Sequence, residues 1–146
     1  MKNSSNLCKE SHSKIAFLPI KPKYVDRFID GTKRYEFRRR PISSDTTHVI
    51  LYATYPRKEI VAFAKVSRIE KSTPGQLWKD KKLHAGISEV EYREYFKGSK
   101  IAYAIEVDMA SMVILPNSIA PREIDPDFVV PQSFRYVNSD FLLKLT

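Results

Sequence analysis

The chain has 146 residues, a formal net charge of +8 and a pI near 9.6. Its hydrophobic fraction of 42% excludes a wholly disordered chain, and a chain of this length can bury one sizeable core. No apolar run approaches the roughly 20 residues that a membrane-spanning helix needs, and a single cysteine, Cys8, excludes an intrachain disulfide. The positive charge favours nucleic acid or nucleotides as partners, although a merely basic surface would give the same balance.

The first residues differ in composition from the rest of the chain. Residues 1–13 are polar, so we expect a flexible tail ahead of a single domain over 14–146. This segment lacks the apolar core of a signal peptide. Together with the lone thiol, that pattern favours a cytoplasmic protein without a membrane partner. The sequence does not indicate an oligomeric state.

The remaining pattern predicts short strands and short helices in alternation. Helical spacing of apolar residues predicts helices over 22–30 and, interrupted at 86–88, over 73–97, with a last helical turn near the C-terminus. A Pro-rich segment begins at 114. Apolar runs and two-residue alternation predict strands at 15–20, 34–40, 48–53, 60–69, 101–107 and 134–137. The expected fold is α+β, a small barrel of about five to six strands with helices at its edge.

Most standard signatures of catalysis are absent from the sequence. It contains no Gly-rich phosphate loop, no dinucleotide fingerprint and no Ser-centred elbow. The three histidines, His12, His48 and His84, do not have zinc-site spacing. We therefore expect no metal site and no cofactor.

The stretch 30-DGTKRYEFRRR-40 carries the densest charge. Lys33 follows a Gly turn, and Glu36 and Arg38 share one face of the predicted strand. Such a pair can offer an acceptor and a fork of donors to one planar ligand. The alternative is a charged edge strand that prevents aggregation, and spacing alone favours this alternative.

A set of motifs in fixed order resembles the ASCH domain family, which shares the PUA-like β-barrel fold. The resemblance covers about residues 15–137 and departs at Ala62, where many members have Gly. The motifs are 20-IKPKY-24, 30-DGTKRYEFR-38, 49-VILYAT-54, 60-IVAF-63, 85-AGIS-88, 95-YFKG-98, 102-AYAI-105 and 131-PQSFRY-136.

The resemblance implies a barrel with a cleft that binds RNA or a nucleotide, with DNA as an alternative partner. Tyr52 and Tyr103 would each stack on a base or pack in the core. Gln132 and Ser133 would meet a base edge or begin a strand. Arg40 would meet phosphate or solvent rather than a base. The expected binding residues are Lys21, Lys33, Glu36, Arg38, Arg40, Tyr52, Tyr103, Gln132 and Ser133.

Some small members of the family resemble amidohydrolases that deacylate acetylated cytidine with a Lys, a Thr and a Glu. Lys33 matches the Lys, whereas Glu36 stands at the Thr position and Ala85 near that of the Glu. Three hypotheses remain open. The chain is a base-binding module, an enzyme acting on a nucleoside or RNA with Lys33 as base or nucleophile and Glu36 orienting it, or a protein-interaction domain.

Overall fold

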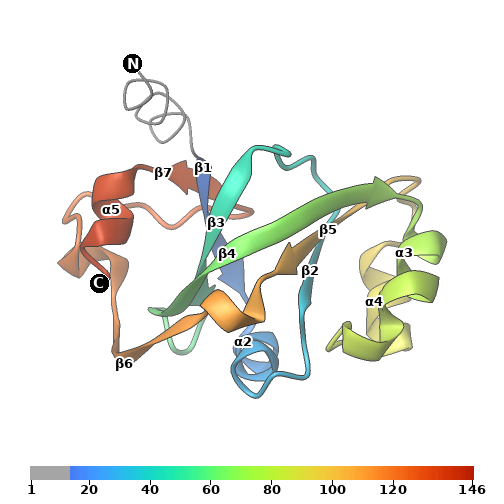
Figure 1. Ribbon diagram of the computed structural model, residues 1–146, viewed down its shortest axis with the longest axis horizontal. Coiled ribbons are helices and arrows are strands. Elements are labelled where there is room, and N and C mark those ends of the chain that lie inside the picture. The colour runs from blue at the N-terminus through green and yellow to red at the C-terminus, as the bar shows by residue number, and fades with distance from the viewer. Residues whose placement is uncertain (1–13) are drawn as a thin grey trace.

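The computed structural model describes residues 14–146, so the predicted tail over 1–13 lies outside the described residues. One sheet has the strand order β2–β5–β4–β3–β1–β7, and β6 pairs with β4 beside this path (Figure 1). β1 runs parallel to β3, and the other pairs are antiparallel. The strands are β1 (Lys14–Ile20), β2 (Tyr35–Arg38), β3 (Thr46–Ala53), β4 (Glu59–Ser72), β5 (Ala102–Val107), β6 (Val113–Ile119) and β7 (Arg135–Val137).

Short helices begin at the caps that the sequence provides. The hydroxyls of Thr73 and Ser88 accept hydrogen bonds from backbone N–H groups of the first turns of α3 and α4. Within residues 14–146, no helix is both long and apolar enough to cross a membrane. The helices are α2 (Pro22–Ile29), α3 (Pro74–Lys81), α4 (Glu89–Tyr95) and α5 (Ser139–Leu143), with 3-10 turns η1 (Lys82–His84), η2 (Met109–Ser111) and η3 (Pro121–Glu123).

The sheet is not closed, so the predicted barrel of five to six strands is wrong, whereas the mixed α+β class is confirmed. Closure would require backbone pairing between the two ends of the sheet, β2 and β7. Instead, the guanidinium of Arg38 on β2 donates to the backbone carbonyl of Ser133, in the segment before β7. This side-chain hydrogen bond connects the two ends of the sheet, where a barrel would have backbone hydrogen bonds between β2 and β7.

The prediction of a Pro-rich segment from residue 114 missed strand β6. Ile114 and Ile119 pair with β4, and the register shifts between these two pairs. Pro116 lies within the shifted stretch, where its missing N–H breaks no ladder bond. An edge strand with a central irregularity is the form in which a sheet tolerates proline.

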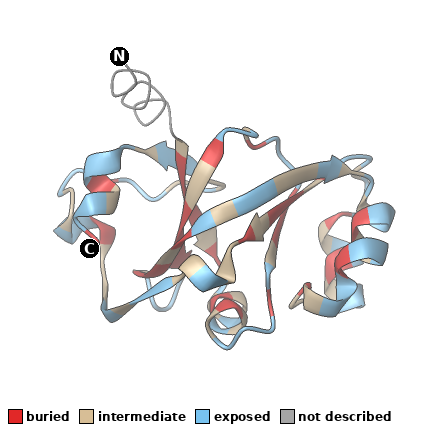
Figure 2. Ribbon diagram, in the orientation of Figure 1, coloured by how far each residue is buried: buried red, intermediate tan, exposed pale blue. Residues whose placement is uncertain are grey.

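Three clusters of buried side chains hold the elements in place. The largest packs α2, through Val25 and Phe28, against strands β1, β3, β4 and β5. Another joins Phe37 of β2 to α3 and α4, and a third lies beneath α5. Figure 2 shows the buried residues on the inner sides of α2 and α4. β2 is an edge strand, as sequence spacing alone favoured, since its printed pairing is with β5, but Glu36, Phe37 and Arg38 on it are buried.

Candidate functional site

A cavity of about 490 Å³ opens between the end of β1, α2, β2 and α4. We call it the Lys33 cavity. Four aromatic rings line it, and three of its six charged residues come from the stretch 30–40. The aromatic residues are Tyr24, Phe37, Tyr92 and Tyr95, and the charged residues are Lys21, Lys33, Glu36, Arg38, Glu91 and Glu94.

Lys33 is almost completely buried, with 1% of its surface exposed. Its Nζ donates a 2.7 Å hydrogen bond to the carbonyl of Ala85, and three aromatic ring centroids lie 5.1–5.4 Å from it. Gly86 has a φ of +64°, and a Cβ there would lie 2.3 Å from the Cβ of Lys33. The Ala85–Gly86 segment therefore has to approach this close, and only glycine permits it.

Burial lowers the pKa of Lys33 from 10.5 to about 8. The carboxylate of Glu36 opposes this shift, while Arg27 and Arg38 add to it. Removal of the ammonium group from water is therefore the main cause of the lowered pKa. With this pKa, most molecules carry a protonated Lys33 at neutral pH.

Glu36 and Arg38 form a nearly buried ion pair beside Lys33. The Arg38 Nη2 and the Glu36 Oε2 are 2.9 Å apart, and the Lys33 Nζ lies 3.9 Å from the other oxygen of Glu36. Both terminal nitrogens of Arg38 also donate, at 3.0 Å each, to the carbonyls of Pro19 and Ser133. Its buried Nε has no partner within residues 14–146. Two cations and one anion leave this cluster with a net charge of +1.

The rim of the cavity joins α2 to α4 through Glu91. Its carboxylate accepts hydrogen bonds from the hydroxyl of Tyr24 and the ammonium of Lys23. These bonds lower the pKa of Glu91 to about 2, while burial and the carboxylate raise the pKa of Tyr24. This contact between α2 and α4 spans 67 residues, so no local pattern in the sequence indicated it.

A second cavity, of about 620 Å³, lies next to the first and shares Pro19 with it. We call it the Lys58 cavity. Lys58 and Arg122 line it, and no carboxylate within residues 14–146 does. Tyr52 forms part of its inner wall, is 5% exposed and packs against Phe17. The two cations had no place among the predicted site residues, since they lie in separate turns.

The structure divides the predicted site residues between these two cavities. Lys21, Lys33, Glu36 and Arg38 line the Lys33 cavity. Two others, Tyr52 and Gln132, line the Lys58 cavity, and Ser133 contributes its carbonyl to Arg38 between them. Tyr103 packs against the main core opposite Arg38, and Arg40 is exposed beyond the end of β2. Neither of these last two lines a described cavity.

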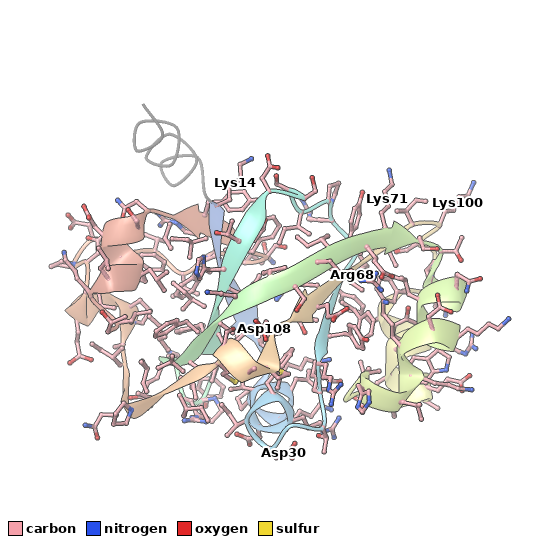
Figure 3. All side chains as sticks on the ribbon, viewed as in Figure 1. Lys14, Asp30, Arg68, Lys71, Lys100 and Asp108 are labelled. Atoms are coloured by element: carbon pink, nitrogen blue, oxygen red, sulfur yellow. The ribbon has the colours of Figure 1, made fainter. Side chains whose placement is uncertain are left out.

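The positive charge of the chain is not concentrated in the Lys33 cavity. Its three lining cations are matched by three lining carboxylates. Lys14, Lys71 and Lys100 project outward along one side of the molecule, and Arg68 forms ion pairs with Glu70 and Glu106 (Figure 3). The lining charges of the Lys33 cavity therefore balance, whereas the Lys58 cavity is lined by cations.

The chain resembles known proteins over most of its length. A family model described as the ASCH domain matches residues 18–111. A protein of Zymomonas mobilis named "ASCH domain-containing ribonuclease" is 30% identical over 133 residues, which span 90% of each chain.

Solved structures extend the comparison to the fold. The crystal structure of ASCH from Zymomonas mobilis gives a TM-score of 0.77 at 30% identity and covers 90% of this chain and 93% of that one. The N-terminal domain of Staphylothermus marinus McrB gives a TM-score of 0.59 over 92% of this chain and 93% of that one. At 10% identity, this second likeness concerns the fold alone.

Proposed function

The chain belongs to the ASCH domain family, and on this premise we propose that it binds single-stranded RNA and cleaves it. A nucleobase occupies the Lys33 cavity, and backbone phosphate lies in the Lys58 cavity. The observation that carries the proposal is the difference in charge between two adjoining cavities that share Pro19. Because a paired base is held in its stack, only an unpaired one can enter such a cavity.

The Lys33 cavity suits a neutral, planar group with hydrogen-bonding edges. Aromatic rings offer stacking surfaces, which contribute roughly 1–3 kcal/mol per base. Lys33 can donate to a base carbonyl, and Glu36 can accept from an exocyclic amine. Arg38 is less suited to the role of donor that the sequence favoured, because its terminal nitrogens already bind Glu36, Pro19 and Ser133. The carboxylates of the rim would repel a phosphate.

The Lys58 cavity suits the phosphate backbone instead. Lys58 and Arg122 place two cations in one cavity without an opposing lining carboxylate among the described residues. The Nε of Arg122 donates to the carbonyl of Phe128 at 3.2 Å, which anchors the guanidinium. Gln132 adds an amide to the same wall. Cations of this kind position nucleic acid by its phosphates.

The proposal of cleavage draws on the relative of Zymomonas mobilis, which is named a ribonuclease. In such a cleavage the 2′-hydroxyl beside the phosphate would attack phosphorus and form a 2′,3′-cyclic phosphate. The bond to the 5′-oxygen would break, and that oxygen would take up a proton from solvent in exchange for the one that the 2′-hydroxyl loses. Negative charge builds on the phosphate oxygens in this step, and cations that are already in place stabilise it. Lys58 and Arg122 would fulfil this role at the phosphate. Lys33 and Glu36 would hold the adjoining base, so that their effect on cleavage passes through substrate binding.

A cleavage assay with a fluorescent single-stranded RNA tests the proposal. The double variant Lys58→Gln with Arg122→Gln should lose at least about 100-fold in kcat/KM, comparable to removing fixed transition-state stabilisation. Lys33→Met should raise KM more than it lowers kcat. Lys71→Gln, which removes an exposed cation outside both cavities, is the matched control and should retain activity. Equal activity in all four proteins, or no cleavage by the wild type, would contradict the proposal of a ribonuclease.

The near-complete burial of Lys33 favours a second candidate, a base-recognition module without cleavage. A lysine that already donates to Ala85 is better placed to hold a ligand than to turn it over. Base-selective binding of RNA that stays intact, lost in Lys33→Met, would identify this function.

A further inference from the structure

Three large apolar side chains are exposed around the Lys58 cavity. Tyr55 is 77% exposed, Val129 67% and Val130 39%, and all three line that cavity. Single exposed apolar residues are ordinary on a protein surface, but a group that surrounds a cationic hollow is not. Such a group would suit an occupant with an apolar face and a negative charge nearby.

Tyr55 lies in a hydrogen-bonded turn between β3 and β4. The Thr54 N–H donates to the carbonyl of Ile20, and the N–H groups of Arg57 and Lys58 both donate to the carbonyl of Thr54. The ammonium of Lys58 lies 5.7 Å from the centroid of the Tyr55 ring. The ring thus stands next to one of the two cations proposed to bind phosphate, with most of its surface open to solvent.

We propose that Tyr55 is the stacking platform for a second unpaired nucleobase, adjacent to the phosphate at Lys58 and Arg122. The bound ligand would then be at least a dinucleotide, with one base in the Lys33 cavity and the next on Tyr55. A nucleotide combines a flat apolar face with an anion a few ångströms away, which is the combination that this rim and this cavity present. The inference rests on the proposed phosphate site and adds a base subsite to it.

The cations of the Lys58 cavity favour nucleic acid over a protein as the partner of Tyr55. An apolar protein surface would cover Tyr55 and Val129 but would leave Lys58 and Arg122 facing it without an anion. An aromatic ring contacts any base through its face, so the subsite should tolerate different bases. Selectivity between bases would remain with the Lys33 cavity.

Binding titrations with a labelled RNA pentanucleotide test the subsite. Tyr55→Ala should weaken binding about 10- to 100-fold, whereas Tyr55→Phe, which keeps the ring, should bind like the wild type. Tyr55→Leu should show most of the loss, because an aliphatic side chain of similar volume lacks the planar face. A set of pentanucleotides with one abasic position each should contain one member against which Tyr55→Ala and the wild type bind equally.

The outcomes separate this inference from the proposed function. If Lys58→Gln with Arg122→Gln weakens binding but Tyr55→Ala does not, the phosphate site stands and the stacking platform is wrong. If Tyr55→Ala weakens binding equally for the intact and every abasic pentanucleotide, the ring acts only through the turn, and the inference is wrong. If neither change alters binding, both proposals fail. A change in the oligomeric state of Tyr55→Ala with unchanged RNA binding would assign the rim to a protein contact.

Discussion

The two cavities that share Pro19 differ in charge and in depth. The Lys33 cavity holds a nearly buried cluster of two cations and one anion under a rim of carboxylates. The Lys58 cavity is lined by exposed cations and exposed apolar side chains. One composition suits a base and the other a phosphate, so under the proposed function selectivity would lie with the first cavity and electrostatic affinity with the second.

Gly86→Ala should damage the Lys33 cavity most. A Cβ at Gly86 would overlap the Lys33 stem, and its φ of +64° disfavours a side chain, so we expect a loss of about 3 kcal/mol in the free energy of unfolding. Gly31→Ala is the matched control, since φ there is +86° but a Cβ meets no atom within 4 Å. It should cost only about 1 kcal/mol. Equal losses in urea denaturation would show that Gly86 does not fix Lys33.

Lys33→Met should stabilise the protein at neutral pH while removing base selectivity. The pKa of Lys33 is about 8 in the folded chain against an ordinary 10.5, so its buried charge costs about 3 kcal/mol below pH 8. Loss of the bond to Ala85 offsets about 1 kcal/mol of this, which leaves a net gain of about 2 kcal/mol. The Glu36–Arg38 pair that remains is neutral.

The lowered pKa of Lys33 also determines how the free energy of unfolding changes with pH. Between about pH 8 and 10.5 the unfolded chain retains the Lys33 proton and the folded chain releases it, so wild-type stability should rise with pH in this window. The advantage of Lys33→Met should therefore shrink as pH increases from 7 to 10. If the difference in free energy of unfolding between the wild type and the variant stayed constant across this range, a depressed pKa of Lys33 would be contradicted. Lys71→Met controls for the loss of an exposed lysine.

Tyr24→Phe should have the smallest effect of the three changes. It removes the hydroxyl that donates to Glu91, but the contact lies at a partly exposed rim and Lys23 still binds the same carboxylate. We expect less than about 1 kcal/mol in stability and only a few-fold weaker binding of a base. Salt dependence of RNA binding should not change, because the Lys58 cavity is untouched. A large change in that dependence would show that the two cavities are not separable.

Local sequence signals predicted the individual helices and strands better than they predicted whether the sheet closes into a barrel. Alternation in 34–40 predicted that Glu36 and Arg38 share a face, and both line one cavity with Lys33. Closure of a barrel depends on pairing between β2 and β7, about 100 residues apart, and no local pattern reports such pairing. The missed strand β6 shows the same limit, because Pro116 argues against a strand unless the bulge that accommodates it is known.

The candidate site depends on long-range contacts in the same way. Family resemblance indicated Lys33, Glu36 and Arg38, and their roles stay predictions. The contacts that define the site join residues far apart: Lys33 to Ala85 across 52 positions and Arg38 to Ser133 across 95. The role of Glu91 at the rim and the absence of lining carboxylates around Lys58, among the described residues, emerge only when these distant segments are brought together.

The most direct test of the account measures the affinity of four single-stranded homopolymeric RNAs at several salt concentrations. For Lys58→Gln with Arg122→Gln, we predict a slope of log K against log salt that is shallower by about 1.4, as expected for two lost phosphate contacts on a single strand, with base preference retained. For Lys33→Met we predict an unchanged slope and a lost base preference. If both variants changed slope and preference together, the division of labour between the two cavities would be contradicted.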